Sequence, residues 1–295
     1  MAQDTTPGML QARRDMVAEA RRIIDAARER GIVLRLFGGL AVREHCDLLY
    51  FCERDYSDID LMARKSQYKE LPDLFALLGF SENVHVRLAT RNRQLQFYRE
   101  CDHPDADLHY FIHPDDHVDV FLDTFRMDHD LSLADRLEIE EYTISQTDVL
   151  LTKLQVASMN DKDERDVVSL LAGVPLGDDD VRGAINVARI ASLCAGDWGL
   201  YRDVLAGIAH VRDGLGGVPL DDERRGRVAV ALDRLEQAVE AEPKSTAWKL
   251  RARVGTRVAW HNVIEEQDVG EHGRPLDDPA EATRGESTEQ GGRLA

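Results

Sequence analysis

Residues 32–61 constrain the fold of this chain more than any other segment. A short apolar run ends at the pair Gly38-Gly39, and a helix-like segment follows. The next apolar run contains two carboxylates, because Asp58 and Asp60 flank a single isoleucine. Residues two apart on a strand share one face, so both carboxylates point the same way. The segment predicts a strand, a helix and a second strand that carries an acidic pair.

The acidic pair has the chemistry of a metal site. Two carboxylates side by side repel each other, and in an apolar setting one of them takes up a proton. A divalent cation removes that cost, and hard oxygen ligands suit Mg²⁺ or Mn²⁺. Asp119, in a later alternating strand pattern, offers a third carboxylate, with Asp123 on the same face as the alternative. We therefore predict that Asp58, Asp60 and Asp119 bind one or two ions beside a triphosphate.

The paired glycines suit a phosphate site at the start of a helix. Without a Cβ atom, Gly38 and Gly39 let backbone N–H groups approach a phosphate closely, and the helix dipole favours the anion. A glycine pair also serves in plain turns. Its position ahead of the acidic pair is what favours the functional interpretation.

Composition limits the classes of protein to consider. The chain has 295 residues, 43% of them hydrophobic, enough for one large domain or two smaller ones. Its net charge of −18 disfavours nucleic-acid or anionic-membrane binding over the whole surface, though not through a local basic patch. No apolar run approaches the roughly 20 residues that cross a bilayer, and we expect no signal peptide and a cytoplasmic location. The sequence has no C-x-x-C spacing, so we expect its four cysteines to be reduced thiols and not a disulfide framework. They are Cys46, Cys52, Cys101 and Cys194.

Apolar periodicity predicts a mixed α/β front part, followed by helices and a tail. In the front part the expected helices span 9–30, 40–49, 71–78, 147–158 and 162–171. The expected strands span 32–37, 58–63, 84–88, 95–98, 108–112 and 117–122. Later helices are expected at 181–194, 200–215, 221–241 and 246–261. From residue 265 nine acidic residues outnumber three arginines and periodicity ends, which is typical of disorder. The predicted domains are 1–175, a helical domain of 176–264, and a disordered acidic tail of 265–295.

Three motifs, in this order, resemble a known family. They are Phe37-Gly38-Gly39-Leu40-Ala41, Ser57-Asp58-Ile59-Asp60-Leu61 and Val118-Asp119-Val120. They resemble the nucleotidyltransferase superfamily, whose fold is shared with DNA polymerase beta. Residues 148–155 and the motif Lys162-Asp163-x-x-Asp166-Val167 are similar to the helical part of AbiEii-type nucleotidyltransferases, which include toxins of type IV toxin–antitoxin systems. The front part also resembles aminoglycoside nucleotidyltransferases, and the resemblance covers roughly residues 30–172.

The resemblance implies a fold, an activity and residue roles. The fold would be an α/β (α+β) nucleotidyltransferase fold with a mixed sheet, followed by the α-helical part and the acidic tail. The activity would be transfer of a nucleoside monophosphate from an NTP to a hydroxyl acceptor, with Mg²⁺ or Mn²⁺ as cofactor. The implied roles are triphosphate contact for Gly38 and Gly39, metal binding for Asp58 and Asp60, metal binding or general base for Asp119, and phosphate binding for Lys153.

Lys153 is also a candidate from its place on its helix. At about 100° per residue it falls inside the apolar arc, where a lysine needs an anion or a wet cleft. Asp163 and Asp166, one turn apart on the next helix, could supply that anion, and so could a triphosphate. The alternatives are a lysine that extends from the core edge to solvent, and two aspartates that only cap or pair on a helix surface.

Two other groups of residues have weaker functional interpretations. His117, two residues before Asp119, is a candidate for substrate contact, whereas the cysteine and histidines at 101–117 match no zinc spacing. A basic, aromatic patch could contact RNA phosphates, or simply pack its tryptophans and solvate its charges. It comprises Lys244, Trp248, Lys249, Arg251, Arg253, Arg257 and Trp260.

The sequence leaves the acceptor open between RNA or tRNA, a protein and a small molecule. A toxin-like enzyme with an antitoxin partner is one form of this activity. An aminoglycoside-type antibiotic nucleotidyltransferase is the alternative, because an acidic surface suits cationic substrates. A non-catalytic nucleotide-binding module is the competing class. No membrane partner is expected.

Overall fold

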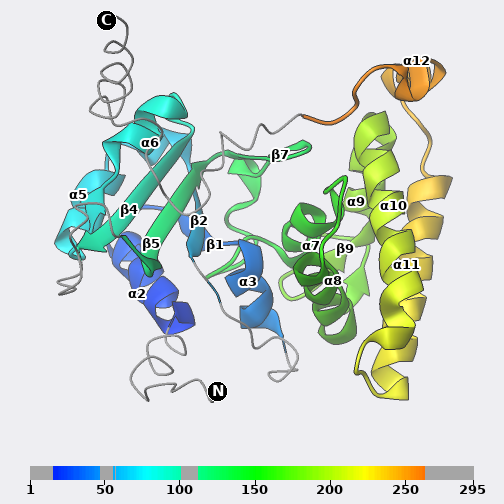
Figure 1. Ribbon diagram of the computed structural model, residues 1–295, viewed down its shortest axis with the longest axis horizontal. Coiled ribbons are helices and arrows are strands. Elements are labelled where there is room, and N and C mark those ends of the chain that lie inside the picture. The colour runs from blue at the N-terminus through cyan, green and yellow to red at the C-terminus, as the bar shows by residue number, and fades with distance from the viewer. Residues whose placement is uncertain (1–15, 47–55, 57, 101–111, 263–295) are drawn as a thin grey trace, which may run out of the picture.

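The computed structural model describes residues 16–46, 56, 58–100 and 112–262. Figure 1 shows a part built on a mixed sheet beside a part built of helices, so the predicted mixed α/β architecture with a helical C-terminal part is confirmed. Buried apolar side chains form one continuous cluster across both parts. The predicted boundary at residue 175 stays a prediction, and the predicted tail of 265–295 lies outside the described residues.

A five-stranded sheet forms the centre of the front part, in the order β1-β2-β5-β4-β3. β2 and β5 are parallel, and the other neighbouring strands are antiparallel. The strands are β1 (Leu34–Leu36), β2 (Ile59–Ala63), β3 (Ser81–Glu82), β4 (Gln94–Glu100) and β5 (Ile112–Leu122). The helices of this part are α2 (Met16–Glu29), α3 (Gly38–His45), α5 (Leu71–Leu77) and α6 (Val84–Ala89).

The rest of the described chain is mainly helical. Its helices are α7 (Gln146–Leu154), α8 (Asp161–Gly173), α9 (Val187–Gly196), α10 (Trp198–Gly214), α11 (Asp222–Ala241) and α12 (Thr246–Val254). Two small ribbons accompany them, β6 (Thr124–Arg126) with β7 (Asp130–Ser132), and β8 (Leu176–Gly177) with β9 (Ile185–Asn186). Single-turn 3-10 helices lie at Lys65–Gln67, Ala134–Arg136, Leu215–Gly217 and Gly255–Arg257.

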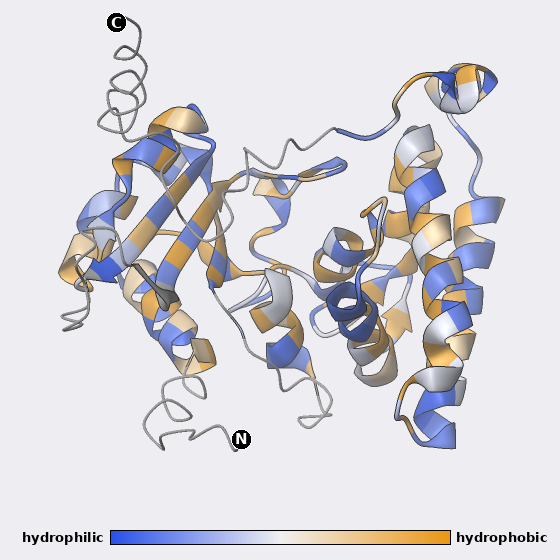
Figure 2. Cartoon of the chain, viewed as in Figure 1, coloured by the Kyte–Doolittle hydropathy of each residue, from blue (hydrophilic) through white to orange (hydrophobic). Residues whose placement is uncertain are grey.

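The parallel pair β2–β5 divides its side chains between two faces, as the alternating pattern predicts. Figure 2 shows the alternation as bands of colour along β4 and β5. One face is apolar and buried, with Ile59 opposite Val118, Leu61 opposite Val120 and Ala63 opposite Leu122. The other face carries Asp60 opposite Asp119 and, two residues on, Met62 opposite Phe121.

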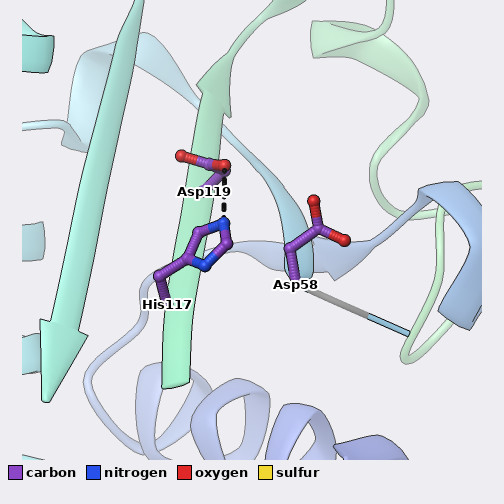
Figure 3. Close-up of side chains that lie close together, drawn as sticks. All are labelled: Asp58, His117 and Asp119. Atoms are coloured by element: carbon purple, nitrogen blue, oxygen red, sulfur yellow. Dashed lines mark ion pairs between the residues drawn. The ribbon is translucent and has the colours of Figure 1, made fainter. Parts of the chain in front are cut away.

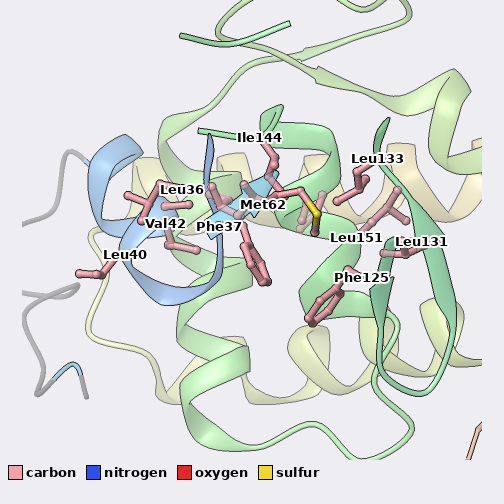
Figure 4. Packing of buried hydrophobic residues seen from close by; sticks show 14 of the residues in the cluster. Leu36, Phe37, Leu40, Val42, Met62, Phe125, Leu131, Leu133, Ile144 and Leu151 are labelled. Carbon is pink, nitrogen blue, oxygen red and sulfur yellow. The ribbon is translucent and has the colours of Figure 1, made fainter. Parts of the chain in front are cut away.

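Aromatic rings close the apolar end of this second face. The Phe37 ring lies 5.1 Å, centroid to centroid, from the rings of Phe121 and Phe125 in edge-on geometry. Figure 4 shows Phe37 and Phe125 packed beside Met62. An acidic surface therefore lies next to tightly packed core on the same face of the sheet.

Several element predictions were wrong in detail. The predicted strand at 84–88 is helix α6. Its apolar residues alternate as in a strand, but Val84 and Leu88 are exposed and none of the described strands pairs with this segment. Residues 108–111 of another predicted strand lie outside the described residues, and β5 begins at Ile112. The helix predicted to end at residue 261 ends at Val254.

Side-chain caps set two helix starts that periodicity misplaced. The helix predicted to span 147–158 is α7, which begins at Gln146 because the Ser145 hydroxyl accepts the Asp148 N–H at 3.2 Å. The helix predicted at 181–194 begins only at Val187, after β9, where the Asn186 side chain accepts the Arg189 N–H at 2.9 Å.

The expectation of four reduced cysteines was also wrong, because Cys46 is disulfide-bonded. Spacing along the chain does not report which thiols meet in the fold. Cys194 is a free, buried thiol, and burial raises its pKa to about 12. Among the described residues, none of the helices has the length and apolar character to cross a bilayer.

A buried ion-pair network anchors the start of α7. Arg136 Nε donates to both carboxylate oxygens of Asp148, at 3.0 and 2.8 Å, and Arg136 Nη2 donates to Asp180 at 3.0 Å. The Asp148 side chain is only 1% exposed and that of Arg136 12%. Burial raises the pKa of Asp148 although Arg136 opposes the shift, whereas the hydrogen bond from Arg136 lowers the pKa of Asp180.

Replacing Arg136 is expected to destabilise the whole chain. Arg136→Leu would leave the buried Asp148 without its cation, and we expect a loss of about 3–5 kcal/mol in the free energy of unfolding, measured by urea denaturation. Arg212→Leu is the matched control, because Arg212 pairs with Asp233 and Glu236 at the surface and is expected to cost about 0–1 kcal/mol. Equal losses for both variants would contradict this assignment.

Candidate metal and nucleotide site

The parallel register of β2 and β5 gathers the carboxylates that the sequence singles out. Asp58 lies immediately before β2, and Asp60 lies within it. Asp119 lies directly opposite Asp60 on β5. Parallel neighbours in register place their side chains on the same face, so acids distant in the sequence lie side by side.

One group in this region has the geometry of a cation site. The ligand atoms of Asp58, His117 and Asp119 all lie within 4.8 Å of one another. His117 Nε2 lies 3.5 Å from Asp119 Oδ2, and Figure 3 shows these two side chains on β5 with Asp58 beside them. Two carboxylates and an imidazole are a donor set that fits a divalent ion. Asp60, the other expected ligand, is not among these three.

Two glutamines position Asp119, and the sequence analysis missed them. Gln94 Nε2 and Gln96 Nε2 donate to the same oxygen, Asp119 Oδ1, at 3.0 and 3.2 Å. Gln96 lies opposite Asp119 on β4, and its own Oε1 accepts a hydrogen bond from Asn83 Nδ2 at 2.8 Å. The only sequence signal was two glutamines at alternate positions of an apolar strand. They hold Oδ1 and leave Oδ2 on the side of His117.

Gly38 is required by Asp60, independently of any phosphate. A Cβ atom on Gly38 would lie 2.4 Å from Asp60 Oδ2, and Gly38 has φ +68°, in the left-handed region. The preceding Phe37 N–H donates to the Asp60 carbonyl at 3.0 Å. The loop from β1 to α3 thus lies directly against the carboxylate of Asp60. Its neighbour Gly39 is the second residue of α3.

The charges around Asp60 do not balance. Burial, and after it the charges of Asp58 and Asp119, raise the pKa of Asp60 well above the ordinary value of an aspartate. Lys153 and His117 act in the opposite direction and do not overcome these effects. The Asp60 carboxyl therefore resists ionisation, which is the physical condition that a bound cation relieves.

Lys153 meets both aspartates that the sequence offered as its partners. Lys153 Nζ lies 3.1 Å from Asp163 Oδ1 and 2.9 Å from Asp166 Oδ2. Burial disfavours the charged ammonium, but Asp166 and Asp163 outweigh that effect and raise the pKa of Lys153. The lysine is therefore a buried cation, close enough to the site to act electrostatically on Asp60. Its phosphate-binding role stays a prediction.

The remaining candidates have structural partners. Asp123 Oδ1 accepts the Lys65 N–H at 2.9 Å at the turn after β5, and Asp123 is not in the cation group. In the basic patch, Arg251 donates to the carbonyls of Gly255 and Val258, both at 2.7 Å. Lys244 Nζ donates to the Glu242 carbonyl at 2.8 Å. These contacts hold the backbone of residues 242–258 in place, so part of the patch has a structural role.

Comparison with known proteins gives little guidance. No protein-family model matches the chain, and no curated protein matches it. Among solved structures it is similar to the solution structure of the antibiotic-resistance factor ANT(2'')-Ia, at 16% identity and a TM-score of 0.32. The match covers 52% of this chain and 82% of that one. A likeness at this level assigns neither family nor activity, and the AbiEii-type resemblance stays a prediction.

The contact between Gly38 and Asp60 yields a test with a matched control. Gly38→Ala and Gly31→Ala both place a Cβ at positive φ, at +68° and +71°, but the Gly31 Cβ would meet nothing within 4 Å. Each is expected to lose about 1–2 kcal/mol of stability. Only Gly38→Ala is expected to weaken Mn²⁺ binding, measured by electron paramagnetic resonance of the free ion, because it displaces Asp60. Equal Mn²⁺ affinity in the two variants would show that this contact does not shape the site.

The pKa of Asp60 predicts how stability changes with pH. A carboxyl whose pKa is higher in the folded state than in the unfolded state keeps its proton better when folded. Stability is therefore lost as pH rises from the unfolded value, about 3.9, through the folded one. We expect the metal-free protein to melt at progressively lower temperature as pH rises above about 4, with a smaller fall in Asp60→Asn. Parallel curves for the two proteins would rule out Asp60 as the source.

Proposed function

We propose that this chain is a metal-dependent nucleotidyltransferase, which moves a nucleoside monophosphate from an NTP to a hydroxyl acceptor and releases pyrophosphate. The observation that carries the proposal is the pairing of Asp60 with Asp119 on the parallel strands β2 and β5, with Asp58 immediately before β2 and the glycine loop that begins α3 beside them. This is the arrangement that the order of the three motifs implies for the nucleotidyltransferase superfamily.

The residues of the chain would divide the work as follows. Asp58 and Asp119 would hold the ion, Mg²⁺ or Mn²⁺, with Asp60 adjacent to them. When bound, the ion supplies charge neutralisation at the triphosphate. The backbone of Gly38 and Gly39 would face the phosphates, because α3 begins there without a side-chain cap.

Lys153 and Asp119 would complete the site. Lys153 would add a positive charge toward the phosphates while Asp163 and Asp166 orient its ammonium. The acceptor hydroxyl would lose its proton near Asp119, whose Oδ1 is held by two amides. The attacking oxygen would then form a bond to the α-phosphorus as pyrophosphate leaves.

The acceptor class remains the open part of the proposal. RNA or tRNA, a protein side chain and a small molecule all carry suitable hydroxyls. A toxin-like role with an antitoxin partner and an antibiotic-modifying role are both compatible with this chemistry. The net charge of −18 favours a cationic acceptor such as an aminoglycoside on electrostatic grounds.

Transfer of label from NTP to acceptor tests the proposal. The protein is incubated with each α-labelled NTP, Mg²⁺ or Mn²⁺, and in turn total RNA, cell extract and an aminoglycoside panel. Asp58→Asn and Asp119→Asn are each expected to reduce transfer at least about 100-fold, since each removes charge stabilisation in the transition state.

The control is Asp233→Asn, which removes an exposed carboxylate on α11 and is expected to leave transfer unchanged. Metal-dependent NTP binding without transfer to any acceptor would overturn the proposal in favour of a non-catalytic nucleotide-binding module. Absence of NTP binding would count against the site itself.

A further inference from the structure

We propose that His117 is a direct ligand of the metal, and that its imidazole biases the site toward a first-row transition ion such as Mn²⁺ over Mg²⁺. This inference rests on the proposed function for the purpose of the metal, but its evidence is the donor set. The superfamily resemblance led us to expect carboxylates alone. The group that the fold assembles contains one imidazole nitrogen among its three donors.

The spacing of His117 and Asp119 suits two ligands of one ion. Donors about 2.1 Å from a metal, at angles of about 90–110°, lie about 3.0–3.4 Å apart. His117 Nε2 and Asp119 Oδ2 lie 3.5 Å apart in the ion-free structure, close to that range. Asp58, immediately before β2, places a carboxylate oxygen close to these two atoms, so the three donors come from β5 and from the residue that precedes β2.

The hydrogen bonds of Asp119 fix which of its oxygens faces the ion. Oδ1 already accepts from Gln94 and Gln96, and Asn83 fixes the amide orientation of Gln96 by donating to its Oε1. Oδ2 is the oxygen turned toward His117. Asp119 is therefore arranged to bind through one oxygen, on the side where the imidazole lies. Such outer contacts orient ligands in metal sites.

An imidazole among the ligands changes the metal preference. Mg²⁺ is a hard ion that favours oxygen donors and retains its waters, whereas imidazole nitrogen suits transition metals. A site of three aspartates would discriminate weakly between Mg²⁺ and Mn²⁺. Replacing one carboxylate by His117 lowers the negative charge that attracts Mg²⁺ and adds a donor that Mn²⁺ binds better.

Pulsed electron paramagnetic resonance of the Mn²⁺-loaded protein tests the inference directly. The native protein is expected to show ¹⁴N modulation from a bound imidazole, replaced by the ¹⁵N pattern after labelling with ¹⁵N-histidine. His117→Gln is expected to lose the modulation and to reduce the ratio of Mn²⁺ to Mg²⁺ affinity at least about 10-fold. His85→Gln, at an exposed position on α6, is the control and should change neither.

The outcomes separate this inference from the proposed function. Mn²⁺ binding without nitrogen modulation in the native protein, or modulation that persists in both His117→Gln and His117→Asn, would overturn it. So would a lack of Mn²⁺ binding. Isotope labelling of the native protein decides histidine ligation even where a variant fails to fold. Label transfer by the native protein decides the proposed function independently, because it needs no particular ligand set.

Discussion

The parallel pairing of β2 with β5 places Asp60 directly opposite Asp119, and the surrounding structure accommodates that crowding. Position 38 is a glycine, and the absence of a Cβ atom leaves room for the Asp60 carboxylate. Gln94 and Gln96 engage one oxygen of Asp119 from the neighbouring strand. A sheet built only for stability would place apolar side chains at these positions. The crowded carboxylates lower the stability of the fold locally but suit ion binding, and packing elsewhere must compensate for that loss of stability.

The packing that offsets this cost lies beside the site on the same face of the sheet, and also on the opposite face. Phe37 precedes Gly38 and packs edge-on against Phe121 and Phe125, so the glycine loop begins from a rigid aromatic cluster. On the opposite face, the paired residues of β2 and β5 from Ile59 and Val118 onward are apolar and buried. Helix α7, which contacts α3, is buried along nearly its whole length, and the Arg136–Asp148 pair anchors its start. The site is thus carried on elements with little freedom to move, which keeps the donors in place.

The sequence predicted the parts of the site that depend on local periodicity. Asp58 and Asp60 share a face because of strand alternation, and an acid in a second alternating run suggested that Asp119 joins them. The place of His117 beside Asp58 and Asp119 was not predicted, since alternation placed it on the same face as Asp119 but gave no distance to Asp58. The segment at 84–88 misled because two-residue periodicity is ambiguous where the side chains stay exposed. The bond of Cys46 depends on a tertiary contact that no spacing reports.

Charge balance determines what can enter the site. Asp58, Asp60 and Asp119 make it acidic, and Lys153, whose charge acts on Asp60, is already paired with Asp163 and Asp166. A free triphosphate would be repelled by the three acids, and Lys153 alone does not offset them. In the proposed function, a nucleotide that arrives with its divalent ion would bring the missing positive charge. The same ion would offset the charges of Asp58 and Asp119, which together with burial raise the pKa of Asp60. Under the proposed function, ion and nucleotide would therefore stabilise each other in this site, and their binding would be coupled in both directions.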